Sequence, residues 1–312
     1  MYKYRVVVSI IFSCLLFLPV MSAAEEPKEK QSRPGFQPGW SQFVRGGAVY
    51  QFDTDLDEGG SYNASRFTIQ AGTGYAWDPR TQVSLALGYS YDGYSFSRGA
   101  GIANRDPWEN IHSLSLGLPM RKSFGEDWSG FLIPSIRSSG ESGATFDESI
   151  TGGVLTGFAY KFGDRLTIGP GIGVISQLEE SATVFPVLII NWKITDKLSL
   201  DTGRGLGATL GPGLTLIYQA NRKWNLAIGG RYDKLRFRLD EDGNVPSGVG
   251  EDKSFPVFAS ASYSFNPKAQ VSLVGGIEFG GELSIEDSDG NRIRKESYDP
   301  GGFLGFTFRV RI

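Results

Sequence analysis

Apolar side chains occupy every second position in many segments of this chain, each about ten residues long. In segment 82–91, QVSLALGYSY, valine, leucine and tyrosine alternate with small or polar residues. Segments 224–232, 269–279 and 301–312 repeat this pattern. Because successive side chains of a strand point to opposite faces, each segment predicts a β-strand with one apolar and one polar face. No stretch from Trp40 onward has the period of an amphipathic helix, so we expect an all-β fold.

Short and long connections alternate between these segments. Six connections are short and polar, and they lie at 78–81, 125–127, 163–165, 195–197, 221–223 and 266–268. The longer connections, several of them strongly acidic, include 53–62, 97–110, 240–253 and 286–299. Six short and seven long connections give about fourteen strands, with about twelve as the alternative, and an even number places both ends of the chain on the same side.

Alternation also occurs in soluble β-sandwiches, so other features must decide what the apolar faces contact. The expected strands are close to the roughly 9–11 residues that a tilted strand needs to cross a bilayer. They are longer than the ~5–6 residues usual in globular sheets. Short turns on one side and long loops on the other are the layout of a membrane β-barrel. We therefore predict that the apolar faces contact lipid and that the polar faces line an interior.

Aromatic residues gather beside the short turns. Aromatic rings are favourable at a membrane–water boundary, and membrane barrels carry girdles of them at both boundaries. The predicted girdle on the short-turn side consists of Trp77, Trp128, Phe162, Trp192, Trp224 and Phe265. The predicted girdle near the long loops consists of Tyr50, Phe52, Tyr89, Tyr91, Tyr232 and Phe279.

Charged residues within the strands provide an internal check on this orientation. Arg45 is near the middle of its strand and alternates with Val44 and Ala48. A register slip of one residue would turn Arg45 into lipid, at a cost of roughly 2–4 kcal/mol near the midplane. The candidate lumen-lining residues are Arg45, Arg137, Lys161, Asp201, Arg231, Glu278, Arg309 and Arg311. This placement indicates a hydrated lumen.

The N-terminal residues 1–24 predict a secretory signal peptide. Lys3 and Arg5 precede the apolar stretch 6–20, and small residues ending at Ala24 form a cleavage site. The alternative interpretation is an uncleaved anchor helix. Residues 25–39 are polar and rich in proline, so we expect a flexible periplasmic leader, followed by the barrel over 40–312. The only cysteine lies within the apolar stretch, so no disulfide is expected in the exported chain.

The chain resembles single-chain Gram-negative outer-membrane β-barrels of unknown function. Its last segment, GGFLGFTFRVRI (301–312), resembles the C-terminal strand that the barrel-assembly machinery recognises, with apolar residues at alternate positions. The resemblance covers the whole exported sequence. It implies an antiparallel up-and-down barrel in the outer membrane with both termini in the periplasm. It also implies contact with the lipid bilayer and lipopolysaccharide, and with the assembly machinery during insertion.

His112, the only histidine, begins a segment whose alternate residues are leucines. Barrel-bound lipid hydrolases, which this layout also resembles, place a serine two residues after the histidine so that the imidazole can activate its hydroxyl. Position 114 is leucine here, so we predict no catalytic residue and place His112 in the outer girdle. With one histidine and no mature cysteine we predict no metal or cofactor site. The net charge of −3 argues against nucleic-acid binding.

Three functions agree with these predictions. The first, favoured by about fourteen strands with a polar inner face, is a porin-like channel for passive uptake of small polar solutes. The second is a barrel plugged by its leader or loops, which contacts lipopolysaccharide or a partner. It is motivated by the apolar inner residues Phe185, Val187 and Ile189. The third and least favoured is a lipid-modifying hydrolase. The sequence gives no indication of an oligomeric state.

Overall fold

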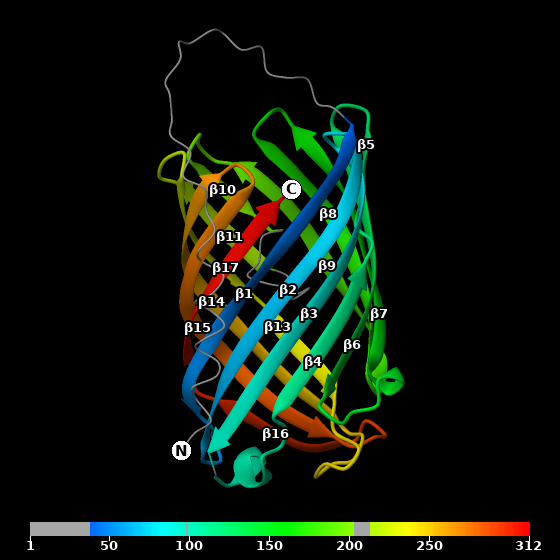
Figure 1. Cartoon of the computed structure of the whole chain (residues 1–312), viewed down its shortest axis with the longest axis vertical. Helices are drawn as coiled ribbons and strands as arrows, with labels where there is room; N and C mark the ends of the chain where they lie inside the picture. The colour runs from blue at the N-terminus through cyan, green and yellow to red at the C-terminus, as the bar shows by residue number, and fades with distance from the viewer. Residues whose placement is uncertain (1–37, 98, 203–212) are drawn as a thin grey trace. The chain divides into compact units, whose positions relative to one another are not determined.

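The computed structural model describes residues 38–97, 99–202 and 213–312, whose strands form one antiparallel sheet that closes on itself (Figure 1). Closure follows because β1 pairs with β2 on one side and with β17 on the other. The strand segments are β1 (Gly39–Asp55), β2 (Ser61–Asp78), β3 (Thr81–Ser97), β4 (Asn110–Gly117), β5 (Met120–Phe124), β6 (Trp128–Glu141), β7 (Ile150–Phe162), β8 (Leu166–Gln177), β9 (Glu180–Lys193), β10 (Leu198–Asp201), β11 (Gly213–Gln219), β12 (Trp224–Arg231), β13 (Asp233–Arg238), β14 (Val249–Asn266), β15 (Ala269–Glu286), β16 (Arg292–Tyr298) and β17 (Gly301–Arg311).

These segments make a barrel of 14 strands, because three of the strands are interrupted. β4 and β5 both pair with β3, β12 and β13 both pair with β14, and β16 and β17 both pair with β15. Pro119 and Pro300 lie at two of the breaks, where a residue without an N–H cannot donate to the ladder. The all-β class and the estimate of about fourteen strands are confirmed.

The six short connections are every second connection along the barrel, and alternate connections of antiparallel neighbours lie at the same end, here called the short-turn end. The opposite end is the long-loop end. Gly39 lies opposite Ala76, and the backbone N–H of Arg311 donates to the carbonyl of Lys268. The first and last strands of the barrel therefore begin and end at the short-turn end.

Several strands are longer than the sequence pattern predicted. β1, β2, β3, β14 and β15 have 17 or 18 residues each. The extra length lies at the long-loop end, so the predicted long connections included residues that belong to strands. Of the expected loop 286–299, residues 292–298 form β16. Acidic residues in these extensions pair across strands, as Glu282 does with Lys253 and Lys295, so an acidic composition did not mark a loop.

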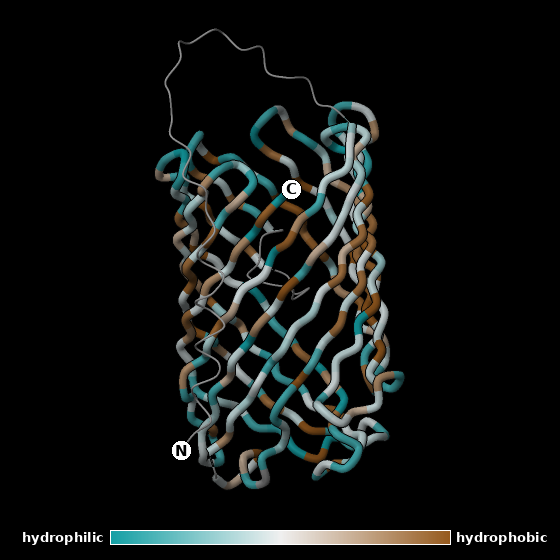
Figure 2. The backbone as a smooth tube through the Cα atoms, in the orientation of Figure 1, coloured by the Kyte–Doolittle hydropathy of each residue, from teal (hydrophilic) through white to brown (hydrophobic). Residues whose placement is uncertain are grey.

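Hydrophobic and hydrophilic residues alternate along the strands (Figure 2), and the large apolar ones are exposed on the outer face of the barrel. Leu85 and Leu87 are 47% and 60% exposed, whereas Ala86 between them is buried. Other large apolar residues exposed on this face include Phe67, Leu132, Ile136, Leu188, Leu226, Ile228, Leu273 and Leu304. An apolar surface this continuous fits a lipid environment rather than water. Among the described residues, no helix is long and apolar enough to cross a membrane.

The interior is filled by side chains at the long-loop end. Trp108, only 1% exposed, lies edge-on to Tyr94, Phe96 and Phe237, with ring centroids 5.9, 5.6 and 5.2 Å away. Ile102, in the 3-10 helix η1 (Gly101–Arg105), donates its backbone N–H to Glu296 Oε2 at 2.6 Å. We call this cluster the apolar closure; its buried residues are Leu56, Tyr62, Ala64, Tyr94, Ile102, Ala103, Trp108, Ile111, Phe237, Leu239, Leu283, Ile285 and Tyr298.

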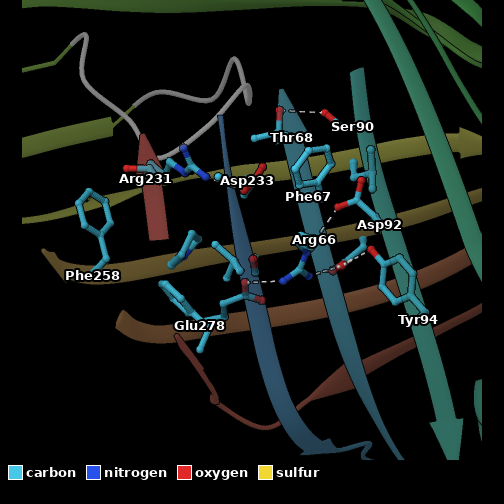
Figure 3. A pocket seen from close by; sticks show the side chains of 18 of the residues that line it. Arg66, Phe67, Thr68, Ser90, Asp92, Tyr94, Arg231, Asp233, Phe258 and Glu278 are labelled. Carbon is cyan, nitrogen blue, oxygen red and sulfur yellow. Dashed lines mark hydrogen bonds and ion pairs between the residues drawn. The ribbon is translucent and has the colours of Figure 1, made fainter. Parts of the chain in front are cut away.

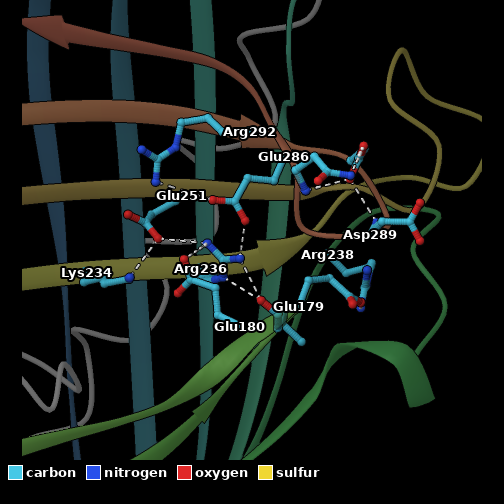
Figure 4. A network of polar contacts seen from close by, with 12 residues as sticks. Glu179, Glu180, Lys234, Arg236, Arg238, Glu251, Glu286, Asp289 and Arg292 are labelled. Atoms are coloured by element: carbon cyan, nitrogen blue, oxygen red, sulfur yellow. Dashed lines mark hydrogen bonds and ion pairs between the residues drawn. The ribbon is translucent and has the colours of Figure 1, made fainter.

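Two arginines of β13, on the face opposite Phe237, connect the surrounding loops (Figure 4). The side chain of Arg236 is 4% exposed and contacts the carboxylates of Glu251 and Glu286. It also donates to the carbonyl of Leu178, between β8 and β9, at 2.9 and 2.7 Å. Arg238 donates to two backbone carbonyls and to the carboxylate of Glu179. The hairpin of β8 and β9 is thereby fastened to β13.

The barrel also narrows at the long-loop end. Arg238 of β13 forms a parallel bridge with Gly140 of β6, although β7 to β11 lie between these two strands in the sheet. β13 and β6 therefore meet across the barrel beside the apolar closure, to which Phe237 of β13 belongs.

Candidate functional site

A cavity of about 130 Å³ lies in the barrel interior beside the apolar closure (Figure 3). Tyr94 and Leu235 contribute to both. The other lining residues used below are Val49, Arg66, Thr68, Ser90, Asp92, Arg137, Arg231, Asp233, Asp252, Phe258, Glu278 and Phe303. They come from strands on several sides of the barrel, so the cavity exists only once the sheet has closed.

The alternation of each strand places these residues inside. On β3, Asp92 follows Ser84, Ala86, Gly88 and Ser90 on the small, polar face. Arg66 of β2 lies directly opposite Asp92 in the ladder. Side chains opposite each other on antiparallel strands lie on the same face of the sheet. Arg66 and Asp92 therefore face the lumen together.

Arg66 is the centre of a polar network at this level (Figure 3). Its guanidinium lies 3.0 Å from Glu278 Oε1, 3.1 Å from Asp252 Oδ2 and 3.8 Å from Asp92 Oδ1. The hydroxyl of Tyr94 donates to Asp252 at 2.8 Å. One guanidinium thus faces three carboxylates, and the network joins β2, β3, β14 and β15.

The hydroxyl of Tyr298 adds to the hydrogen bonds of the same carboxylates. It donates to Asp252 Oδ1 at 3.2 Å and to Glu278 Oε2 at 3.5 Å. Buried carboxylates are costly unless they are paired and hydrogen-bonded. Here both conditions are met for Asp252 and Glu278, so this part of the cavity wall is a satisfied polar network.

The wall formed by Arg137, Arg231 and Asp233 has a different balance. Arg231 Nη2 donates to Asp233 Oδ2 at 3.2 Å. Four buried atoms have no hydrogen-bond partner among the described residues: Arg137 Nε, Arg231 Nε, Arg231 Nη1 and Asp233 Oδ1. Two guanidiniums thus accompany one carboxylate, so this wall carries a positive charge that its own residues do not neutralise.

An apolar wall completes the cavity. Phe258 and Phe303 are 4% and 6% exposed, and they pack with Val274 and Val49 in a small apolar cluster. Val49, Phe258 and Phe303 also line the cavity. The cavity therefore combines aromatic and aliphatic surface with buried cationic donors.

Of the predicted lumen-lining residues, three meet in this cavity: Arg137, Arg231 and Glu278. Two others lie in one row of the sheet, in which Arg45 is opposite Arg309 and each arginine also lies opposite a glutamine. Arg45 Nε donates to Gln70 Oε1 at 2.7 Å, and Arg309 Nη2 donates to Gln270 Oε1 at 3.1 Å.

The remaining three lie apart from the cavity. Lys161 donates to Asp164 at 2.8 Å beside a short turn. Asp201 accepts a hydrogen bond from Asn191 Nδ2 at 2.9 Å. Arg311 is exposed at the end of β17. The structure thus brings together a subset of the predicted residues rather than one continuous ring.

The predicted short-turn girdle residues all lie at or near strand ends beside short turns and are exposed. Their exposed fractions run from 42% for Trp192 to 60% for Phe265. Several belong to ring clusters, such as Trp128 and Phe162 around Tyr160, at centroid distances of 4.9 and 4.7 Å. Contact of these rings with a membrane boundary stays a prediction.

Sequence reasoning missed Arg66, Asp92, Asp233 and Asp252. One further step of the alternation along β3, from Ser90 to position 92, reaches the aspartate. Asp252 was hidden because it lies in the acidic segment 240–253, assigned to a loop, and it belongs to β14. The alternation of side chains was therefore sufficient to find Asp92, whereas the acidic composition of 240–253 concealed Asp252.

His112 lies on the outer face beside Tyr89 and Ser142. Its Nδ1 is 2.9 Å from the Tyr89 hydroxyl, and its Nε2 is 3.1 Å from Ser142 Oγ. Ser113, predicted to point the other way, is buried and lies 2.9 Å from Ser139 Oγ. The histidine therefore contacts Ser142, which directly follows β6, at the exposed surface of the barrel.

A closed antiparallel barrel with an apolar outer face and a polar interior defines the class of single-chain outer-membrane β-barrels. Within that class, the chain belongs to the family described as Domain of unknown function (DUF6268), which matches residues 84–302. No curated protein matches the chain in sequence.

Solved structures with a similar fold include an outer-membrane channel. The COG4313 outer membrane channel from Pseudomonas putida F1 is 9% identical, with a TM-score of 0.51 over 93% of this chain and 100% of that one. A Pseudomonas aeruginosa FadL homologue is 12% identical, with a TM-score of 0.46 over 87% of this chain and 90% of the other. The first likeness shows that the barrel has the fold of an outer-membrane channel.

Proposed function

We propose that this protein is an outer-membrane channel for small solutes that carry polar groups, and that the apolar closure controls passage. The polar inner face of a barrel of 14 strands supports a lumen. The likeness in fold to an outer membrane channel supports transport over catalysis. The observation that carries the proposal is a lumen with a wet half and a closed half.

The wet half is the short-turn half. Arg45 points inward and is nevertheless exposed, so solvent reaches the lumen there. Beyond the charged cavity, Trp108 and its neighbours fill the interior. A solute entering from either end meets the apolar closure as the main barrier. Passage then requires movement of the closure, whose members Trp108 and Leu239 are in connections between strands rather than in the barrel wall.

Planar-bilayer recordings of the refolded protein test this proposal. We expect Trp108→Ala to raise the open probability or conductance of single channels, because the substitution removes the largest fully buried side chain of the closure. Trp128→Ala is the matched control, since Trp128 is exposed beside a short turn. A wild-type protein and a Trp108→Ala variant that both insert without conducting would overturn the proposal.

A plugged interaction barrel is the second candidate, and the apolar closure favours it too. The apolar inner residues of β9, which suggested a plug in the sequence, have another explanation: they pack on glycines of the neighbouring strands. A Cβ added to Gly173 would lie 2.2 Å from the Phe185 ring, and one added to Gly171 would lie 3.4 Å from Val187.

The proposed leader, 25–39, lies almost wholly outside the described residues. Deletion of 25–39 separates the candidates, because conductance that appears only after deletion identifies the leader as the plug.

We also infer that residues 1–24 direct export and are removed, and that the short-turn end faces the periplasm. Outer-membrane barrels place their short turns on the periplasmic side, and the segment 301–312, which resembles an assembly signal, ends at the short-turn end; both observations support this orientation. Mass spectrometry of the protein from outer-membrane fractions would give the mature N-terminus. Protease treatment of whole cells would cleave in the long loops and spare the short turns, and the reverse pattern would refute the orientation.

A further inference from the structure

We propose that the cavity binds a small organic acid, with its carboxylate held by Arg137 and Arg231 and its apolar body against Phe258 and Phe303. This inference rests on the proposed channel function in one respect: the acid is the solute that the channel carries. The binding site itself is argued from the contacts within the cavity.

The first argument concerns hydrogen-bond donors. Arg137 Nε, Arg231 Nε and Arg231 Nη1 are buried and lack a partner among the described residues. A buried donor without an acceptor costs free energy, and more so when it carries charge. A carboxylate supplies two oxygens that match the planar fork of a guanidinium. The unused donors therefore favour a ligand with a carboxylate.

The second argument concerns the sign of the ligand charge. Around Arg66 the acceptors of Asp252 and Glu278 already bind the guanidinium and the hydroxyls of Tyr94 and Tyr298. A cationic ligand would have to compete with Arg66 for those carboxylates. An anion bound by Arg137 Nε and by Nε and Nη1 of Arg231 displaces no contact of the described residues, because the hydrogen bond from Arg231 to Asp233 uses Nη2.

Asp92 and Asp233 are the nearby charges that oppose an anion. Asp92 is paired with Arg66 across the ladder, and Asp233 Oδ2 accepts from Arg231 Nη2. Asp233 Oδ1 remains an acceptor without a partner among the described residues, so it suits a hydroxyl or protonated group rather than a second carboxylate. Over the whole cavity, the three guanidiniums of Arg66, Arg137 and Arg231 face four carboxylates, those of Asp92, Asp233, Asp252 and Glu278. The positive charge is therefore local to Arg137 and Arg231, which favours a monoanion there over a dianion.

The third argument concerns the size and the apolar part of the ligand. Phe258 and Phe303 face the cavity from β14 and β17 and have almost no contact with solvent. The volume of about 130 Å³ is close to the roughly 150 Å³ of an apolar cavity that accepts benzene. An acid with one ring therefore fits, and benzoate is the simplest probe.

Isothermal titration calorimetry on the refolded protein in detergent tests the site without any need for transport. We expect benzoate to bind, and benzyl alcohol and benzylamine, which match its ring but lack the anion, to bind about tenfold more weakly or worse. Raising the salt concentration should weaken benzoate binding and leave that of benzyl alcohol unchanged. Equal binding of the three probes would overturn the proposal, and this comparison uses only the wild-type protein.

Variants then locate the site. Arg137→Met and Arg231→Met should each weaken benzoate binding by about tenfold or more, because each removes a charge-assisted contact. Arg45→Met is the matched control: it removes a luminal arginine outside the cavity, and benzoate affinity should stay within about twofold. Arg137→Lys keeps the charge without the planar fork and should lie between wild type and Arg137→Met. Unchanged benzoate affinity in Arg137→Met and Arg231→Met would refute the assigned contacts.

The two proposals fail in different experiments. If the protein or its Trp108→Ala variant conducts but benzoate does not bind in the calorimeter, the acid site is wrong and the channel stands. If benzoate binds with the expected dependence on Arg137 and Arg231 while no variant conducts, the site stands and the channel is wrong.

Discussion

The two halves of this barrel use the same alternation of side chains for different interiors. In the short-turn half, inward residues such as Arg45 remain exposed and bind glutamines across the ladder. In the long-loop half, inward strand residues such as Tyr62 and Phe237 are as buried as in the core of a soluble protein. The pattern along a strand therefore defines which residues face inward, but not whether the interior is wet or packed.

Strand length and loop packing account for the difference. The strands that exceed the bilayer span carry their inner faces into a region where the loops can cover them. There, η1 and the segment around Trp108 supply apolar groups, and Arg236 and Arg238 fasten the neighbouring hairpins. A membrane barrel can thus contain a core of globular type at one end.

The same type of substitution in each half gives the largest expected contrast. Arg236→Ala removes the buried cation that Glu251 and Glu286 share and leaves them only the more exposed Lys234 and Arg292, so we expect a loss of about 3 kcal/mol in the free energy of unfolding. Arg45→Ala removes an exposed group and should cost less than about 1 kcal/mol. Urea unfolding of the protein in lipid vesicles, followed by tryptophan fluorescence, measures both. Equal losses would show that the two halves do not differ in packing.

A glycine pair gives an intermediate effect. Gly173→Ala introduces a Cβ against the Phe185 ring, and we expect a loss of about 1–3 kcal/mol from overpacking. Gly152→Ala is the control, because the nearest atom to its added Cβ, the Ser135 carbonyl oxygen, is 3.9 Å away. The same unfolding assay compares them. A Gly173→Ala variant as stable as Gly152→Ala would show that the inner wall of β8 and β9 is loosely packed.

The smallest expected effect is at the outer surface. His112→Ala removes contacts with Tyr89 and Ser142, which lie at the exposed face, so stability should change by less than about 1 kcal/mol. We expect neither the wild-type protein nor the variant to hydrolyse phospholipid in mixed-lipid vesicles. Hydrolysis by wild type that is lost in both His112→Ala and Ser142→Ala would instead assign this pair to a lipid-modifying enzyme.

Local patterns predicted the class and the strand number, and three of the candidate luminal residues, Arg137, Arg231 and Glu278, line the cavity. Those predictions depend on periodicity and turn chemistry, which are properties of short segments. The partners of the cavity are not local, since Arg66 and Glu278 are 212 residues apart and meet only across the closed sheet. The ends of the strands were also beyond local reach, because Glu282 and Asp252 look like loop residues until their cations are placed beside them.

The row that contains Arg45 and Arg309 has a consequence for assembly. The two arginines face each other across the seam between the first and last strands, and like charges in that position repel. The seam must therefore be held by its lipid-side neighbours, such as Val44 with Val310 and Ala48 with Phe306, and by the amide oxygens of Gln70 and Gln270 on either flank. The repulsion between these two arginines opposes the pairing of β1 with β17 that closes the barrel. A nascent chain therefore gains little free energy by pairing these two strands before both flanking hairpins have formed.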